Sequence, residues 1–426
     1  MKKFLRVLIL VRHFGPLAVA LPLWAIPACR VWLGERVAHT LEACGATFIK
    51  LGQIMSSRPD LVAPEIINAL MRLQDRAPEH DVATTRRIIA AAFGQGAARL
   101  FKQIDDHPIA SGSIAQVHAA HLADGRKVAV KVRHPDLEKT VGMDVEIIEA
   151  VAALAGRMPG AQWLDMPGSA RNFGDTVRGQ LNLVNEAEHL KRFRANFAHK
   201  PNVRFPEPIE GLVASDVLVE SFEEGVPMSK ILSSDYPDKP EIARLGLDIF
   251  LQMIARDGFV HADMHPGNIL GRWEDGKPVA VVLDCGMVAE LKEKDRRNYV
   301  NFFVAVSQFD GRNAAQQMID NAPRHDCREP DVFKGALEAI FEQVRHLPIS
   351  EIEAAKVLGQ IMQLVRKHRI QMESAFTSVN VGIMVLEGVG RQLDPNLNLL
   401  NTAGPIFMGY VLEAQARALE QQAAAA

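Results

Sequence analysis

The sequence has few cysteines and no excess of charge of either sign. Four cysteines occur in 426 residues, and no two of them stand in a paired spacing: Cys29, Cys44, Cys285 and Cys327. This pattern argues against a disulfide framework or a zinc knuckle and indicates free thiols in a reducing, cytoplasmic compartment. The formal net charge is only -3, with 48 basic and 51 acidic residues. The composition therefore predicts no nucleic-acid partner.

Long hydrophobic runs are also scarce, and only residues 1–36 come close to a membrane-spanning segment in length and apolar composition. The uncharged run 14–29 contains three prolines and is shorter than the roughly 20 residues that cross a bilayer. It lacks a convincing small-x-small cleavage site, so a signal peptide does not fit well. We expect either a buried, proline-broken helix or a segment that docks on an anionic membrane surface. The basic residues that would face the lipid headgroups are Lys2, Lys3, Arg6, Arg12 and Arg30.

The chain is longer than one ordinary domain, which predicts two lobes or a core with helical extensions. Between residues 36 and 74 apolar residues recur every three or four positions, and RPDLVAP interrupts the pattern before Pro64. This pattern predicts a helical hairpin, with Pro64 in a first helical turn. From residue 108 to 133 the period becomes two, and QVHAAHLADGRKVAVKVRHP predicts two strands joined at Asp124-Gly125.

The second half of the chain is mostly helical in pattern. Two amphipathic helices are expected after the hairpin, and the stretch VRFPEPIEGLVASDVLVESF then returns to strand character. Gly211 and Asp216 should bound the turn in this stretch. After Glu223 we expect almost only helices, apart from one short apolar strand at 279–284.

One lysine interrupts the apolar strand VAVKV. Val128, Val130 and Val132 point to one face, which leaves Ala129 and Lys131 on the other. An unpaired buried ammonium is too costly to stay charged. Lys131 therefore either reaches water from an edge strand or binds a carboxylate or a phosphate. Taken alone, the strand favours the edge position.

Small residues precede this hairpin in PIASGSIAQVH. Small side chains let backbone N–H groups approach a phosphate closely. The stretch matches neither a P-loop nor a full G-x-G-x-x-G, so its spacing is equally compatible with a plain tight turn. Its position just before the strand with Lys131 favours a nucleotide loop. The candidate nucleotide-binding residues are Ile109, Ala110, Ser111, Gly112, Ser113, Ile114, Ala115, Gln116 and Val117.

The stretch HADMHPGNIL contains the next candidate site. Asp263 lies two residues after His261, Asn268 lies five after Asp263, and Asp284 and Gly286 follow a hydrophobic strand. This H-x-D-x-x-x-x-N and D-x-G order is that of phosphoryl-transfer enzymes of the kinase type. Asn268 and Asp284 supply the hard oxygen ligands that Mg²⁺ prefers, and Asp263 is placed to orient or deprotonate an acceptor. We expect His261 to support the backbone of the loop.

A zinc site is the rival interpretation of this stretch. His261 and His265 are accompanied by no Cys or Glu in metal-ligand spacing, and the Glu of H-E-x-x-H is missing. We favour a turn histidine at His265, beside Pro266. A structural turn alone would not require the small-residue loop, the strand lysine and both motifs in that order.

In this order the motifs resemble the UbiB/AarF family of atypical protein-kinase-like proteins, over roughly residues 38–398. The stretches that carry the resemblance are FIKLGQIMSSRPDLVAP, PIASGSIAQVH, VAVKV, HADMHPGNIL, VVLDCG and EGVGRQLDP. The resemblance implies an α+β, bilobal protein-kinase-like fold with a family-specific N-terminal helical extension and a mainly helical C-lobe. The implied parts are the apolar and basic segment 1–36, the extension 37–104, the N-lobe with a helical insertion 105–222, and the C-lobe 223–426.

The resemblance also implies roles for individual residues. Lys131, Asp263 and Asn268 would be catalytic, and Asn268 and Asp284 would hold Mg²⁺ beside ATP. Glu186 would be the partner of Lys131, although Glu188 lies close to it in the sequence. Glu220, in VESFEEG, would lie at the inter-lobe hinge against the adenine.

Lys50 and Gln53, in KLGQ, stand three apart on one helical face. Without the family they would be an exposed polar pair on an amphipathic helix. The resemblance implies a helix that covers the active-site mouth, where ordinary kinases admit a peptide. After Asp284 the chain passes almost directly into ELKEKDRRNYVNFFVAV, with no A-P-E and no room for a long activation segment. We therefore do not expect peptide phosphorylation.

Two positions depart from the family pattern. An acidic pair that usually precedes Glu186 is replaced by Gln180 and Asn182, which removes two charges that could serve metal binding or hold the N-terminal helix. Gly112 stands in a loop that is mostly Ala and Ser in the family, and glycine adds backbone freedom that could shift nucleotide preference.

The function implied by the resemblance is an atypical kinase or ATPase that binds Mg-ATP and supports ubiquinone biosynthesis. Its partners would be ATP, a lipophilic quinone precursor or an anionic membrane surface, and other ubiquinone-biosynthesis proteins, at the inner face of the cytoplasmic membrane. Two alternatives stay open. One is a small-molecule or lipid kinase, because such enzymes use a similar H-x-D-x-x-x-x-N loop. The other is a pseudokinase scaffold, to which Gln180 and Asn182 point.

Overall fold

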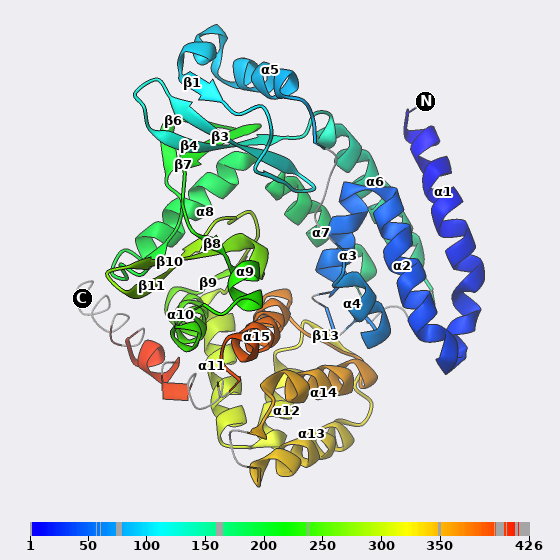
Figure 1. The fold of residues 1–426 in the computed structure, drawn as a ribbon. Helices are drawn as coiled ribbons and strands as arrows, with labels where there is room; N and C mark the ends of the chain where they lie inside the picture. Colours follow the sequence, from blue (N-terminus) through cyan, green and yellow to red (C-terminus); the bar gives the residue numbers. More distant parts are fainter. Residues whose placement is uncertain are drawn as a thin grey trace, which may run out of the picture. The chain divides into compact units, whose positions relative to one another are not determined.

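The computed structural model describes residues 2–56, 58–59, 61–73, 79–158, 165–236, 238–347, 351–395, 397, 404–405, 407–413 and 416. Its contacts divide the chain into two compact units. Unit 1 comprises Met1–Arg192 and Pro206–Glu223, and unit 2 comprises Phe193–Phe205 and Glu224–Ala426. The elements of each unit are labelled in Figure 1.

Unit 1 combines helices with one sheet. Its helices are α1 (Lys2–Ala20), η1 (Leu21–Ala25), η2 (Pro27–Cys29), α2 (Arg30–Cys44), α3 (Ala46–Ser56), α4 (Pro64–Leu70), α5 (Val82–Phe93), η3 (Gln95–Arg99), α6 (Leu137–Ala155), α7 (Met166–Gln180) and most of α8 (Leu183–Asn196). Its strands are β1 (Phe101–Ile104), β2 (Ala110–Ser111), β3 (Ala115–Leu122), β4 (Lys127–Arg133), β6 (Pro208–Ala214) and β7 (Val217–Ser221).

The N-terminal helices of unit 1 pack on one another around a small core. Leu41, Phe48 and Leu70 are buried in it, one each from α2, α3 and α4. Gly52 on α3 allows this approach, because a Cβ there would stand 2.4 Å from Leu73 Cδ1. The predicted break before Pro64 is confirmed, but the first arm of the predicted helical hairpin is divided into α2 and α3 at Gly45, which has a φ of +93°.

Two charged pairs hold helix α1 to α6: an exposed one between Lys3 and Glu146, and a buried one between Arg6 and Asp144. The Arg6 guanidinium binds both carboxylate oxygens of Asp144 on α6, at 2.6 and 2.7 Å, and also donates to the Cys44 carbonyl at 2.7 Å. The Asp144 side chain is completely buried, so it requires this partner. Leu10, one turn further along α1, is buried on the same face.

The expectation that the N-terminal segment is too short to cross a bilayer was wrong. Helix α1 continues through Pro16, and the 23-residue segment Lys3–Ala25 is long and apolar enough to cross a membrane by length and composition. The prediction considered only the uncharged run 14–29 and left out residues 3–13, which precede it and belong to the same helix. Only 6% of the apolar window in this segment is buried in the structure.

The sheet of unit 1 is antiparallel, with the strand order β1-β3-β4-β7-β6 and with β2 paired to β3. The predicted hairpin is confirmed: β3 and β4 pair from Ala115↔Arg133 to His121↔Lys127 around Asp124-Gly125. Its first strand begins at Phe101, slightly before the expected start of the N-lobe at residue 105. The turn between β6 and β7 is at 215–216, whereas Gly211 lies inside β6.

Unit 2 is mainly helical but also contains a sheet. Its helices are α9 (Met228–Ser233), α10 (Lys239–Gln252), the π-helix η5 (Met253–Asp257), η6 (Pro266–Asn268), α11 (Glu293–Ser307), α12 (Gly311–Asp320), α13 (Pro330–Arg345), α14 (Ala354–Lys367) and α15 (Ser374–Leu393). Its strands are β5 (Val203–Arg204), β8 (Val226–Pro227), β9 (Phe259–His261), β10 (Ile269–Glu274), β11 (Lys277–Val282), β12 (Val288–Glu290), β13 (Arg324–His325) and β14 (Ile370–Gln371).

The sequence reasoning missed most of the strands in unit 2. It predicted the strand that is β11, but β10 pairs with β11 in a hairpin from Ile269↔Val282 to Glu274↔Lys277. Asp275 and Gly276 join them with φ angles of 49° and 75°, and a two-residue hairpin turn with two positive φ angles is of type I′. The Asp-Gly pair was therefore the signal for this hairpin.

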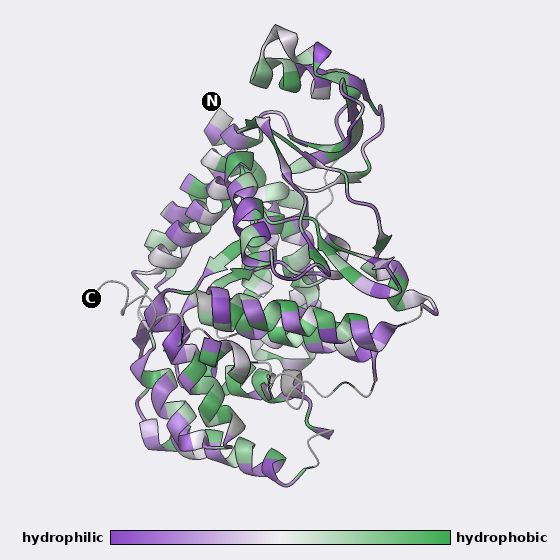
Figure 2. Cartoon of the chain, turned by 90° about the vertical axis from the view of Figure 1, so that its left-hand side faces the viewer, coloured by the Kyte–Doolittle hydropathy of each residue, from purple (hydrophilic) through white to green (hydrophobic). Residues whose placement is uncertain are grey.

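The helices of both units show hydrophobic and hydrophilic residues mixed along their length, as amphipathic helices that cover a core do (Figure 2). In unit 2 the buried members of α11 to α14 form one cluster. Among them are Phe302, Phe333, Phe341, Ile361 and Val365. This cluster is the hydrophobic core of the second half of unit 2.

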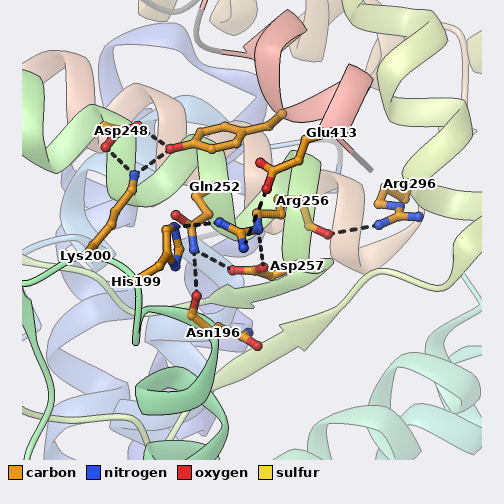
Figure 3. A network of polar contacts seen from close by, with 10 residues as sticks. Asn196, His199, Lys200, Asp248, Gln252, Arg256, Asp257, Arg296 and Glu413 are labelled. Atoms are coloured by element: carbon orange, nitrogen blue, oxygen red, sulfur yellow. Dashed lines mark hydrogen bonds and ion pairs between the residues drawn. The ribbon is translucent and has the colours of Figure 1, made fainter. Parts of the chain in front are cut away.

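A polar network surrounds the end of α10 and the π-helix η5 (Figure 3). Gln252 Nε2 donates to the Asn196 carbonyl and to Asp257 Oδ2, both at 3.1 Å. Arg256 lies between Asp257 and Glu413, at 3.8 and 3.7 Å from their carboxylates. The chain leaves η5 and enters β9, whose last residue is His261. The network thereby fixes the backbone from which HADMHPGNIL begins.

The same network binds the described C-terminal residues to α10. Lys200 pairs with the Asp248 carboxylate and donates to the Tyr410 hydroxyl at 2.5 Å. The Tyr410 hydroxyl donates in turn to Asp248 Oδ1 at 2.5 Å. Burial, reinforced by this hydrogen bond, raises the pKa of Tyr410. The hydroxyl therefore stays protonated and keeps its role as a donor.

Candidate active site

Lys131 lies on a central strand of unit 1. Strand β4 pairs with β3 on one side and β7 on the other, so the edge-strand position is wrong. Lys131 Nζ is 2.7 Å from Glu186 Oε1, and the two side chains are only 13% and 5% exposed. Glu188 is exposed and pairs with Lys191 instead. Glu186 thus holds Lys131 charged and extended within a largely buried environment.

The small-residue loop is a tight hairpin of unit 1. Strands β2 and β3 pair through Ala110↔Val117 and Ser111↔Gln116, and Gly112 N–H donates to the Ala115 carbonyl at 2.9 Å. His134, just after β4, contacts the loop twice: its N–H donates to the Ile114 carbonyl, and its Nε2 is 2.9 Å from the Gly112 carbonyl. The loop is therefore fixed by backbone contacts, with Ser113 buried and Ile109 exposed.

A group of buried polar residues behind this loop was not foreseen. Gln116 is fully buried, accepts from His80 N–H and donates to the His80 carbonyl, both at 3.0 Å. His80 Nδ1 lies 3.1 Å from His134 Nδ1. Burial, with smaller effects of His134 and His118, lowers the pKa of His80 to about 4. The Gln116 side chain is therefore engaged with His80.

Glu220 lies at the end of unit 1, on β7. It is buried and stands opposite Ala129 of β4. The chain passes from unit 1 to unit 2 three residues later, between Glu223 and Glu224. The hinge in VESFEEG and the contact of Glu220 with adenine stay predictions.

The candidate catalytic loop of unit 2, HADMHPGNIL (261–270), is organised around His261. His261 Nδ1 accepts from the Asp263 N–H at 3.1 Å, and Nε2 contacts the Asp284 carbonyl. Since Nδ1 is an acceptor, the proton belongs on Nε2, which donates to that carbonyl. Complete burial lowers the pKa of His261, so the ring is neutral in this role. His261 therefore connects the loop to the end of the strand that carries Asp284.

Asn268 and Asp284 are brought together by the same backbone contacts. Asn268 Nδ2 donates to the Asp263 carbonyl at 3.2 Å, and Leu283 N–H donates to the Asn268 carbonyl at 2.8 Å. Asp284 Oδ1 accepts from Gly286 N–H at 2.8 Å. Donation through Nδ2 leaves the amide oxygen of Asn268 as the atom that would bind a cation. One amide oxygen and one carboxylate suit Mg²⁺, which completes its shell with water and phosphate.

His265 helps to form a turn, as its position beside Pro266 predicted. Its Nδ1 accepts from Gly267 N–H at 3.0 Å, which closes the turn before Asn268. Among the described residues, no group of three or more His, Cys, Asp or Glu side chains could hold a metal ion.

The segment after Asp284 is short. Strand β12 pairs with β9 through Val288↔His261, and α11 begins at Glu293. Leu291 N–H donates to the Gly258 carbonyl at 2.8 Å. Few residues thus separate the D-x-G motif from a packed helix, and they pair with the strand that leads into the catalytic loop.

The remaining candidates lie on helices of unit 1. Lys50 is 4% exposed on α3, and Gln53 is half-buried on the same helix. Asn182 Oδ1 accepts from Val184 N–H at 3.2 Å at the start of α8. Gln180 Oε1 is buried and has no hydrogen-bond partner within the described part of the chain. One of the two replacements thus has a structural use as a helix cap.

Known proteins similar to this chain agree with these features. The family model of the ABC1 atypical kinase-like domain matches residues 72–318, and that of the UbiB helical domain matches residues 337–398. The chain is 34% identical to the protein named Probable protein kinase UbiB of Serratia proteamaculans, over 92% of this chain and 74% of that protein. It is 30% identical to the probable serine/threonine-protein kinase abkC of Dictyostelium discoideum, over 92% of this chain and 67% of that protein.

One solved structure supports the fold. The complex of Rv3197 with erythromycin, from Mycobacterium tuberculosis, has a TM-score of 0.59 at 23% identity, over 84% of this chain and 92% of that one. With the family models, the expected α+β protein-kinase-like fold is confirmed. Since the kinase-like model spans more than half of the sequence, this chain belongs to the ABC1 atypical kinase-like family and carries the UbiB helical domain.

Proposed function

We propose that this chain binds Mg-ATP and acts as an atypical ATPase or kinase in ubiquinone biosynthesis. The observation that carries the proposal is the buried Lys131–Glu186 pair on a central strand. A lysine fixed by a carboxylate on this strand is the arrangement with which kinase-type enzymes hold nucleotide phosphates. The relatives named UbiB support the link to ubiquinone.

Each unit has its own candidate residues. In unit 1, Lys131 and the loop 109–117 would bind the phosphates. In unit 2, Asn268 and Asp284 would hold Mg²⁺, which neutralises phosphate charge when bound. Asp263 would orient the acceptor, and the neutral His261 keeps its backbone in place.

We favour lipophilic precursor handling over peptide phosphorylation. The short connection between Asp284 and α11 leaves little chain for a peptide platform. Lys50 and Gln53 would cover the acceptor side, as the family resemblance implies. A lipid kinase differs only in transferring the phosphoryl group, so it stays the second candidate. A pseudokinase scaffold would require ATP binding without turnover.

Helix α1 would dock the protein on an anionic membrane surface. Arg6 and Leu10 face the protein, and Phe4, Leu5, Leu8 and Val11 are exposed on the other side. A helix that spanned the bilayer would leave the buried Asp144 without Arg6, which is unfavourable. An apolar face beside basic residues is typical of helices that lie in the membrane interface.

The nucleotide assignment is tested by Lys131→Met. We expect ATP to bind about tenfold or more weakly, because a charge-assisted hydrogen bond contributes about 1.5–3 kcal/mol. The measurement is titration with a fluorescent ATP analogue. Lys139→Met is the matched control, since Lys139 is exposed on α6 and pairs with the exposed Asp136. Unchanged affinity in a folded Lys131→Met protein would contradict the assignment.

The membrane assignment is tested by Leu8→Glu. We expect about tenfold weaker co-sedimentation with anionic phospholipid vesicles, because the substitution removes buried apolar area from the interface and adds a negative charge. Val332→Glu is the control, because Val332 is equally exposed but lies on α13 of unit 2. Equal vesicle binding by both variants would rule out docking through α1.

The biosynthetic role is tested by quinone content in cells that lack the protein. We expect a lowered ubiquinone level that wild-type protein restores and Asp284→Asn does not. Asp275→Asn serves as the control, because Asp275 is an exposed turn residue with a φ of 49°, which Asn tolerates equally well. A normal ubiquinone level without the protein would contradict the role.

A further inference from the structure

Unit 2 contains an apolar pocket apart from the residues assigned to the nucleotide. Helices α10, α11, α13, α14 and α15 bound about 860 Å³ of empty space, its open mouth included. Its walls include Leu251, Phe302, Phe341, Leu358 and Ile383. Among the described residues no charged side chain lines it, so the pocket suits a neutral molecule.

One amide interrupts this apolar lining. Asn380 of α15 is 1% exposed and lines the pocket. Neither its Oδ1 nor its Nδ2 has a hydrogen-bond partner among the described residues. A buried polar group without a partner is unfavourable, and a leucine at this position would avoid that cost. The amide offers one acceptor and two donors to whatever enters the pocket.

We infer that this pocket binds an elongated, neutral lipophilic molecule with one hydroxyl or carbonyl group, which hydrogen-bonds to Asn380. The apolar walls take the hydrocarbon part, and the amide selects for the polar end. The inference deepens the lipophilic handling proposed above, and its biological role rests on that proposal. Tyr299 also lines the pocket, and its phenol offers a second neutral hydrogen-bonding group.

Two residues of the stretch EGVGRQLDP hold part of the wall of this pocket. Arg391 pairs with the buried Glu387 at 3.1 Å and donates to the Ile352 carbonyl at 3.3 Å. The Ile352 side chain is part of the pocket wall. Glu387 and Arg391 therefore act as positioning residues that hold the wall against α15.

A second apolar pocket in unit 2 shares one wall residue with the first. Leu386 of α15 lines both pockets. The second one has about 580 Å³ of empty space and reaches Met264 and Pro266 of HADMHPGNIL. Leu386 is therefore a wall residue of both pockets.

The inference is tested with 4-hexylphenol and hexylbenzene, which differ by one hydroxyl. Each competes with the fluorophore N-phenyl-1-naphthylamine for the full-length protein, without nucleotide. We expect Asn380→Leu to lower the preference for the phenol about tenfold, as the loss of one buried hydrogen bond implies. Because the variant removes an unpaired buried amide, its thermal unfolding midpoint should equal or exceed that of wild type.

A second variant tests the location of the pocket. Ile383→Trp should fill the space and weaken both ligands at least tenfold, whereas Val332→Trp, at an exposed position of α13, should weaken neither. If Ile383→Trp fails to fold, the phenol preference of Asn380→Leu decides alone. An unchanged preference in Asn380→Leu, or unchanged affinity in a folded Ile383→Trp protein, overturns the inference.

These outcomes are separate from those of the nucleotide assignment. Binding that depends on Asn380, in a protein that fails to bind ATP, would uphold the pocket and reject the proposed function. Normal ATP binding without any displacement of the fluorophore by 4-hexylphenol would reject the pocket alone.

Discussion

A charged side chain inside a protein has to be paired, and this requirement fixes the main features of both units. Glu186 pairs with Lys131 on the central strand of unit 1, and the buried Asp144 pairs with Arg6 on α1. Breaking one partner from a buried pair typically costs about 3–5 kcal/mol. The pairs therefore set where the helices around them can lie. In unit 2, Glu387 is paired in the same way.

The catalytic loop depends on neutral contacts instead. His261 joins the Asp263 backbone to the Asp284 carbonyl, and Asn268 closes the loop from its other end. These contacts bring the two candidate ligands, Asn268 and Asp284, together without a cluster of like charges. Charge at this position would then come from the nucleotide phosphates and the metal ion when they bind. Asn380 differs from these residues, because its buried Oδ1 and Nδ2 have no hydrogen-bond partner among the described residues.

Sequence reasoning predicted the features that have a local signal and missed those that depend on distant partners. The alternation in VAVKV and the Asp124-Gly125 turn predicted the β3–β4 hairpin, and the motif order predicted the fold. Strand β10 was missed although Asp275-Gly276 marks its turn. The contact of His80 with Gln116 and the burial of Asn380 had no local signal, because the residues around them are far apart in the sequence.

The central claim is that Asp284 binds a divalent cation for the nucleotide, and a magnesium titration tests it most directly. The affinity for ATP is measured at increasing Mg²⁺ concentration in wild type, Asp284→Asn and the turn control Asp275→Asn. The account predicts that Mg²⁺ strengthens ATP binding in wild type and in the control, and has little effect in Asp284→Asn. The same dependence on Mg²⁺ in all three proteins would contradict it.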